Sequence, residues 1–250
     1  MVGYLNTQPF KWALEGIDQL GHEIVYENPA DCAISLISDK VDLALIPAGA
    51  LHDLEQYSIH TDYCIGCDGE VRTVVIYSNE ELSTLDTIYL DDHSRTSQLL
   101  SKIVISDFYG FDCRYKKVDV SNMKPLPSGS GVLMIGDKVF ANEGKYKFKY
   151  DLGAEWKKFT GLPFVFAVWV SKSIHHPDHI FIKDINKRMN RVFENLDLFL
   201  QERPAIVNGI LQDRYFKKNI SYTFAKAKKM ALKLFLQKSK PLVAAEAHLF

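Results

Sequence analysis

The sequence predicts an α/β protein with two lobes and a ligand cleft between them. Three observations support this prediction. Strand and helix patterns alternate at the start of the chain, a second alternating unit covers about residues 83–160, and an apolar strand at 164–170 returns the chain before a helical C-terminal part. This order predicts a discontinuous first lobe (1–80 and 164–250) and a second lobe (81–163). Strands of open α/β sheets end at such a cleft and bind ligands there.

The first unit begins with a strand of at most four residues, 2–5, which ends at Asn6 and Thr7. Apolar residues at helical spacing predict a helix over 8–20, and Gly21 is a natural C-terminal stop. The polar residues after the strand therefore lie where a helix begins.

A second short strand is expected over 23–28. Asn28 and Pro29 then have the chemistry of a helix start, because an amide cap is followed by proline at the first helical position. Residues 42–47 are typical of a buried strand, so the first unit is expected to be a parallel β-α-β-α-β arrangement.

Residues 63–78 contain two β-rich runs on either side of Asp68 and Gly69, which is a strong hairpin signal. A further strand is expected over 87–92. It leads into a helix that ends at Gly110. The buried stripe of this helix is formed by Leu99, Leu100, Ile103, Val104 and Phe108.

Two more strands, 113–120 and 132–137, are separated by a loop rich in proline, glycine and serine. A short helix over 154–159 follows, and then the apolar returning strand. From about residue 177 to 240 we expect helices: a long amphipathic helix that Pro204 ends, and a lysine-rich helix.

Composition narrows the classes of function. The chain has 250 residues and a net charge of −1, so nothing in its overall charge favours nucleic acid or a membrane surface as a partner. Its longest apolar run, 163–170, is far shorter than the ~20 residues of a membrane span. No secretory signal pattern is visible, and the four cysteines are sparse. We therefore expect a cytoplasmic protein with neither nucleic acid nor membrane as partner.

Polar or turn residues lie at the ends of the predicted strands, at points that we expect to meet in the cleft. Asn6 has a simpler interpretation as a cap of the first helix, and Asp137 one as a turn or cap residue. The candidates are Asn6 and Thr7 at the end of the first strand, Pro47 and Ala48 at the end of the third, and Gly136 and Asp137 at the end of the strand at 132–137.

The stretch Ser94, Arg95, Thr96, Ser97 lies at a predicted helix start. The first turn of a helix has unpaired backbone N–H groups and a partial positive charge, so it binds anions. Three hydroxyls and one guanidinium there suit a carboxylate or phosphate. Capping of the helix by Ser94 or Thr96 is the simpler alternative.

Other features carry weaker signals. Residues 64–67 form a single C-x-x-C, which lacks the two further ligands of a structural zinc site and does not begin a helix. The histidines of HHPDH, 175–179, suit a solvated turn, and the lysine-rich helix suits a solvated face. No dinucleotide, phosphate-loop, nucleophile-elbow or zinc-protease motif is present. We therefore expect neither a metal nor a cofactor.

Several stretches, in order along the chain, resemble the chorismate dehydratases of the futalosine route to menaquinone. The resemblance spans about residues 2–170. It implies the type II periplasmic-binding-protein fold, used in the cytoplasm as a hydro-lyase. Chorismate would lose water to give 3-[(1-carboxyvinyl)oxy]benzoate, without a cofactor. The stretches that carry the resemblance include YLNTQPF, DLALIPAGAL, LDDHSRTSQLL, LMIGDKVF and DLGAEWKKFTGLPFVFAVWV.

The resemblance also implies roles for residues. Asn6 and Ser94 are the catalytic candidates: Asn6 would hold the reacting ring or the departing hydroxyl, and the hydroxyls of the helix start would hold a carboxylate. In the family, the substrate's own side-chain carboxylate has been proposed as the base. Family members usually have a few more residues before the first strand, so that strand is expected to be short here. The substrate-binding candidates are Thr7, Pro47, Ala48, Arg95, Thr96, Ser97, Gly136 and Asp137.

Two alternatives stay open. A 1,4-dihydroxy-6-naphthoate synthase of the same pathway and fold would have a Cys-Pro-Asn type of turn, where this chain has YLNTQP. A non-catalytic solute-binding protein would share the fold but act outside the cytoplasm, and it would return its ligand unchanged.

Overall fold

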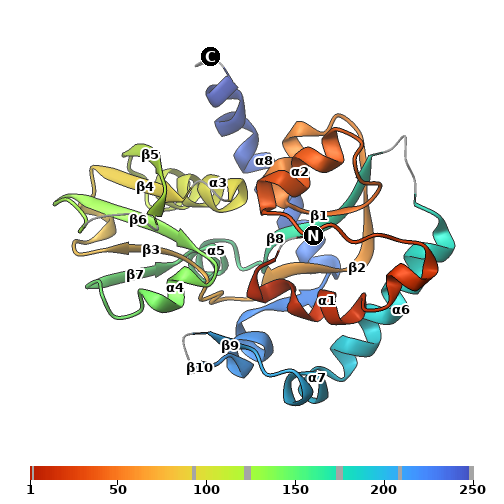
Figure 1. The fold of residues 1–250 in the computed structure, drawn as a ribbon. Helices are drawn as coiled ribbons and strands as arrows, with labels where there is room; N and C mark the ends of the chain where they lie inside the picture. Colours follow the sequence, from red (N-terminus) through yellow and green to blue (C-terminus); the bar gives the residue numbers. More distant parts are fainter. Residues whose placement is uncertain (2, 92–93, 121–124, 173–176, 208–209, 248–250) are drawn as a thin grey trace.

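The protein consists of two lobes, each built around its own sheet, and the chain crosses between them (Figure 1). This architecture agrees with the predicted fold class. The structure is a computed structural model, and it describes residues 1, 3–91, 94–120, 125–172, 177–207 and 210–247.

The first lobe contains a four-stranded sheet in the order β1-β8-β2-β11, in which every neighbouring pair is antiparallel. The returning strand β8 is central, because it pairs with β1 on one side and β2 on the other. Its apolar run is buried on both faces, as the sequence predicts. The strands are β1 (Ala44–Pro47), β2 (Tyr57–Cys67), β8 (Phe164–Lys172) and β11 (Ser221–Thr223).

Helices and turns surround this sheet. Helix α2 begins where predicted, because Pro29 is its first residue and the Asn28 side chain accepts the Asp31 N–H at 3.0 Å. The elements are η1 (Leu5–Thr7), α1 (Gln8–Ala13), η2 (Ile17–Leu20), α2 (Pro29–Ile37), η3 (Ala48–Asp53), α6 (His179–Glu194), α7 (Leu196–Glu202), the pair β9 (Ile206–Val207) and β10 (Ile210–Leu211), the π-helical turn η7 (Tyr215–Asn219) and α8 (Lys226–Ala247).

The second lobe contains a five-stranded mixed sheet in the order β5-β4-β6-β3-β7. The pairs β5-β4 and β4-β6 are parallel, and the other two are antiparallel. Its strands are β3 (Val74–Ser78), β4 (Thr87–Asp91), β5 (Arg114–Val118), β6 (Ser130–Ile135) and β7 (Phe148–Asp151). Its helices and turns are η4 (Leu82–Thr84), α3 (Arg95–Ile103), the π-helical turn η5 (Val104–Phe108), α4 (Lys138–Ala141) and α5 (Leu152–Thr160).

The N-terminal part differs from the prediction. The described residues of 2–5 and 23–28 form no regular strand, and Val2 lies outside the described residues. The chain instead coils into η1, where the Thr7 N–H donates to the Tyr4 carbonyl at 3.1 Å. The predicted helix over 8–20 is interrupted because Gly16 takes a left-handed φ of 73°. The expected parallel β-α-β-α-β unit is therefore wrong.

The predicted hairpin over 63–78 is also wrong. Strand β2 pairs with β8 and β11, whereas β3 pairs with β6 and β7 in the other sheet. Residues 68–73 are therefore a crossing between the lobes. We propose that the first lobe boundary falls in this crossing and not at residue 80.

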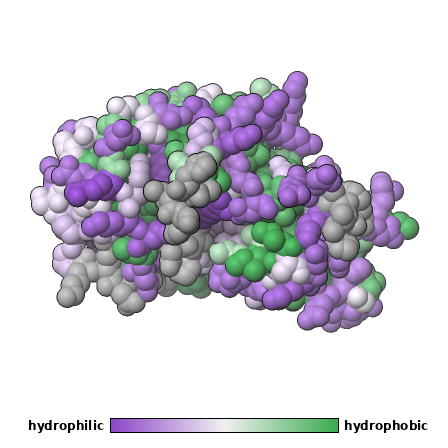
Figure 2. Space-filling model, turned by 90° about the horizontal axis from the view of Figure 1, so that it is seen from above, coloured by the Kyte–Doolittle hydropathy of each residue, from purple (hydrophilic) through white to green (hydrophobic). Residues whose placement is uncertain are grey.

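The C-terminal part is less helical than predicted. The expected amphipathic helix is two helices, α6 and α7, which meet at Asn195, and residues 206–223 contain short strands and η7. Helix α8 projects away from the lobes at its C-terminal end (Figure 1). The face seen from above is largely hydrophilic, with apolar residues in small patches (Figure 2).

Candidate active site

A pocket lies between the two lobes, beside the start of α3. The empty space among its lining side chains, open solvent at its mouth included, is about 590 Å³. Apolar side chains dominate the lining, and its polar side-chain groups are hydroxyls and one amide. The lining residues are Tyr4, Asn6, Pro29, Pro47, Ile65, Val71, Thr73, Val74, Ser94, Ser97, Ile135, Gly136, Phe166, Ala167 and Ile220.

Half of the candidates predicted from the sequence meet in this lining, although they come from distant parts of the chain. They are Asn6 from η1, Pro47 from the end of β1, Ser94 and Ser97 from the start of α3, and Gly136 from the end of β6.

Among the described residues with an unpaired buried side-chain atom, Asn6 is the one that lines the pocket. The Tyr222 hydroxyl donates to its backbone carbonyl at 2.9 Å. Its side-chain Oδ1 is buried, yet this atom has no hydrogen-bond partner among the described residues. An unpaired buried acceptor costs about 1–3 kcal/mol, and such a group in a native protein calls for an explanation. A ligand whose hydrogen-bond donor pairs with Oδ1 would explain it.

The start of α3 provides the second polar group of the pocket. Ser94 caps the helix, because its Oγ accepts the Ser97 N–H at 3.3 Å, and the two hydroxyl oxygens are 3.0 Å apart. Capping and pocket lining thus occur together. The positive end of the helix dipole and these hydroxyls favour an anionic group here.

Gly136 and Asp137 directly follow β6. Gly136 has a left-handed φ of 67° and lines the pocket. Asp137 lies behind this lining, where its carboxylate accepts the Leu5 N–H and so joins the second lobe to η1. Burial raises the pKa of Asp137, and this hydrogen bond opposes the rise.

The other candidates at the start of α3 lie outside the pocket lining. Thr96 is buried between the lobes: its Oγ1 accepts the Gly49 N–H at 2.9 Å and donates to the Phe166 carbonyl at 3.3 Å. Arg95 pairs with Asp53 at the surface. Both residues thus hold α3 against the first lobe.

Thr7 and Ala48 also lie outside the lining. The Thr7 hydroxyl donates to the Tyr4 carbonyl at 2.7 Å and closes the turn η1. Ala48 is part of the hydrophobic core of the first lobe.

Comparison with known proteins decides the family. The model of the menaquinone biosynthesis family matches residues 1–241, almost the whole chain. The chain belongs to this family. A curated relative from Thermus thermophilus, named chorismate dehydratase, is 24% identical over 243 residues, which cover 87% of this chain and 86% of the relative. The resemblance seen in the sequence is thus confirmed at the level of the family.

Solved structures confirm the fold of this menaquinone biosynthesis family member. An Archaeoglobus fulgidus protein aligns with a TM-score of 0.64 at 13% identity, covering 98% of this chain and 96% of its own. The periplasmic aliphatic sulphonate binding protein of Escherichia coli aligns with a TM-score of 0.60 at 10% identity, covering 98% and 92%. A Candida albicans protein described as having the generic periplasmic binding protein fold aligns with a TM-score of 0.56 at 16% identity. The alignment covers 94% of this chain and 88% of the Candida albicans chain.

Sequence reasoning missed several polar residues in and behind the pocket of this family member. Thr73 lines the pocket from the crossing, and Tyr215 and Tyr222 lie behind Asn6. These residues have no motif of their own. The signal that could have found Thr73 is its place between the two apolar runs, once those runs are assigned to different sheets.

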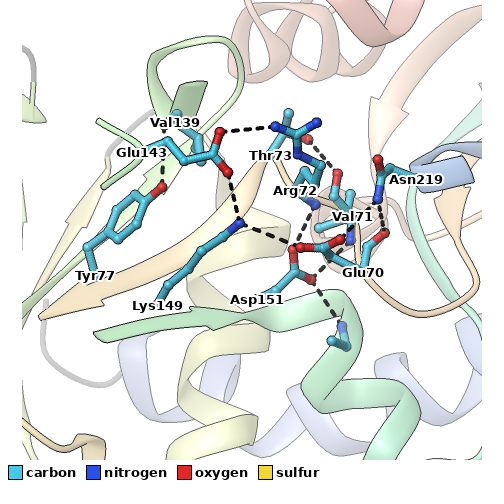
Figure 3. Close-up of polar contacts among 11 residues, drawn as sticks. Glu70, Val71, Arg72, Thr73, Tyr77, Val139, Glu143, Lys149, Asp151 and Asn219 are labelled. Atoms are coloured by element: carbon cyan, nitrogen blue, oxygen red, sulfur yellow. Dashed lines mark hydrogen bonds and ion pairs between the residues drawn. The ribbon is translucent and has the colours of Figure 1, made fainter. Parts of the chain in front are cut away.

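The crossing itself is held by one carboxylate (Figure 3). Asp151 accepts the N–H groups of Val71 at 3.0 Å and Arg72 at 2.7 Å, and it caps α5 by accepting the Ala154 N–H at 3.0 Å. Burial raises the pKa of Asp151, and the three hydrogen bonds oppose the rise. Arg72 has a left-handed φ of 64°, an uncommon conformation that such contacts stabilise.

The C-x-x-C motif lies in the interior of the first lobe. Burial raises the pKa of the Cys64 thiol to about 11, although the ammonium of Lys228 lies 3.6 Å from its sulfur. Cys67 is also buried as a free thiol. Of the HHPDH histidines, His175 and His176 lie outside the described residues. Across the residues that the structure describes, no group of three potential metal ligands occurs, and no helix is long and apolar enough to span a membrane.

Proposed function

We propose that this protein is a chorismate dehydratase, a hydro-lyase that converts chorismate to 3-[(1-carboxyvinyl)oxy]benzoate and water. The observation that carries the proposal is the pairing, in one pocket, of a helix start suited to an anion with Asn6, whose buried Oδ1 has no hydrogen-bond partner among the described residues. The family and the name of the Thermus thermophilus relative support the same reaction.

The pocket suits the charge of chorismate. One carboxylate would bind at the start of α3, where the Ser94 and Ser97 hydroxyls and the helix dipole favour an anion. The ring would then lie against the apolar lining, with its C4 hydroxyl donating to Asn6 Oδ1. In this pose, Asn6 fixes the hydroxyl that leaves, and water is largely excluded from the ring.

The elimination removes the C3 proton and the C4 hydroxyl, which leaves an aromatic ring. Among the described lining residues there is no carboxylate, imidazole or amine side chain; Asp92 and His93 lie outside the described residues. This lining supports the substrate's own side-chain carboxylate as the base. Poor solvation in an apolar pocket raises the basicity of a carboxylate, which helps it to take the C3 proton. The protonated carboxyl group then gives this proton to the C4 hydroxyl, which leaves as water.

The test is to incubate purified protein with chorismate and to separate the mixture by liquid chromatography with mass detection. Conversion to a product lighter by one water supports the proposal. Recovery of unchanged chorismate, with tight binding, would instead indicate a solute-binding protein. Absence of both turnover and binding would contradict the proposal and favour the 1,4-dihydroxy-6-naphthoate synthase alternative.

A hydroxyl substitution tests the proposed carboxylate subsite. We expect Ser97→Ala to weaken chorismate binding about 10-fold, because a hydrogen bond to a charged group contributes roughly 1.5–3 kcal/mol. The matched control is Ser101→Ala on the same helix, whose buried hydroxyl donates to the Gln98 carbonyl at 2.7 Å. Calorimetric titration should show a higher Kd only for the first variant; equal affinities would remove Ser97 from the subsite.

We also propose that the protein acts in the cytoplasm on this small molecule alone. Its place in a biosynthetic family supports this assignment. Fractionation of cells that express a tagged full-length chain would test the location.

A further inference from the structure

A buried pair of hydroxyls lies behind the pocket. The Tyr215 hydroxyl is 3.1 Å from Thr73 Oγ1, and both residues are almost fully buried, with 1% and 3% of their surfaces exposed. Thr73 belongs to the crossing and lines the pocket, whereas Tyr215 begins the π-helical turn η7. The pair therefore connects the C-terminal part of the chain to the pocket.

The turn η7 is fixed to the crossing at both of its ends. Tyr215 contacts Thr73 at the first end, and at the last Asn219 donates through Nδ2 to the Glu70 carbonyl at 3.0 Å. Figure 3 shows Asn219 beside Glu70, in the network that surrounds Asp151. Since Asp151 also holds the crossing by hydrogen bonds to two of its N–H groups, Tyr215 has little freedom to move.

Tyr215 also reaches Asn6. Burial raises the pKa of Tyr215, and hydrogen bonds with Thr73 and with the Asn6 side chain oppose this rise. The phenol is therefore neutral at physiological pH and can accept a hydrogen bond from the Asn6 amide group. The Asn6 backbone is held separately, by the Tyr222 hydroxyl.

These contacts leave one atom of the Asn6 side chain, the buried Oδ1, without a hydrogen-bond partner among the described residues. We propose that Tyr215, held by Thr73, is a positioning residue for Asn6: it fixes the side-chain amide so that Oδ1 faces the ligand. This inference rests on the proposed function, since Asn6 is there the group that holds the departing hydroxyl. An amide able to rotate would present its N–H₂ group to that hydroxyl for part of the time.

The first test is Tyr215→Phe, which keeps the aromatic ring and its edge-on contact with the Phe140 ring, whose centroid is 5.6 Å away. We expect kcat for chorismate to fall about 10- to 100-fold, because misplacing one reacting group by about 1 Å has effects of this size. KM should change less than about twofold, since the helix start still binds the carboxylate. The matched control is Tyr77→Phe, another buried tyrosine, whose hydroxyl donates to the Val139 carbonyl in the second lobe; its kinetics should be those of the wild type.

A binding cycle then separates positioning from a direct role. Calorimetric titration with the dehydration product would compare the wild type, Asn6→Ala, Tyr215→Phe and the double variant. If Tyr215 acts through Asn6, the double variant should bind as Asn6→Ala does. Additive losses would overturn the inference, because Tyr215 would then act independently of Asn6.

The outcomes distinguish this inference from the proposed function. A wild-type protein that does not dehydrate chorismate contradicts the proposed function, and with it the inference. An active wild type, an inactive Asn6→Ala variant and a Tyr215→Phe variant with normal kcat would contradict the inference alone. A Tyr215→Phe variant whose kcat recovers when Thr73→Val is added would also overturn it, since the loss would then come from an unpaired Thr73 hydroxyl.

Discussion

Asn6→Ala is expected to lower kcat at least about 100-fold, the scale seen when a preorganised polar group is removed from an active site. The free energy of unfolding should stay within about 1 kcal/mol of the wild type, because removing Oδ1, a buried acceptor without a partner among the described residues, offsets the loss of the hydrogen bond between Asn6 and Tyr215. A large kinetic effect without a stability cost is typical of a group kept for function. Steady-state kinetics with chorismate and urea unfolding measure the two quantities.

A second asparagine provides the control. The Asn219 side chain also has a buried Oδ1 without a partner among the described residues, but its Nδ2 donates to the Glu70 carbonyl at 3.0 Å and to the Glu70 carboxylate at 3.4 Å. Asn219→Ala removes both hydrogen bonds and should lower stability by about 1–2 kcal/mol. Near-normal turnover in Asn6→Ala would exclude this residue from the mechanism. A loss of several kcal/mol of stability in the same variant would show that its amide serves the fold.

The sequence predicts those parts of the fold that depend on local chemistry. Asn28 and Pro29 identify the start of α2, and Ser94 that of α3, because a cap needs only the residues next to it. The apolar run of β8 indicates a central strand from its own residues alone, because a strand that is buried on both faces has few polar side chains.

Features that depend on distant pairing could not be predicted in this way. Asp68 and Gly69 have the local chemistry of a hairpin, but each flanking strand pairs with partners from later in the chain. At the start of α3, Ser97 and Thr96 have similar hydroxyls. Only the positions of Gly49, 47 residues earlier, and Phe166, 70 residues later, assign Thr96 to the contact between lobes. Tyr215 reaches the site through a similarly distant contact with the crossing.

Asp151 is where the largest effect on stability is expected. Its carboxylate is the shared acceptor for two N–H groups of the crossing and one of α5. Asp151→Ala leaves these three donors without an acceptor, at a position where only 8% of the Asp151 surface is exposed to solvent. Each unpaired buried donor costs about 1–3 kcal/mol, so we expect a loss of roughly 3–5 kcal/mol, after allowing for water that reaches the more exposed Arg72 N–H.

Asp151→Asn should lose less, about 1–3 kcal/mol, because one carbonyl oxygen stays to accept while the new N–H₂ group faces a donor. Asp178→Ala separates this effect from ordinary capping. Asp178 caps α6 by accepting the Ile180 N–H at 2.9 Å on the exposed surface, so its loss should cost about 1 kcal/mol. Urea unfolding should rank the variants in the order Asp178→Ala, Asp151→Asn, Asp151→Ala from most to least stable. Equal stabilities for Asp178→Ala and Asp151→Ala would mean that Asp151 only caps α5 and that the crossing is held by other contacts.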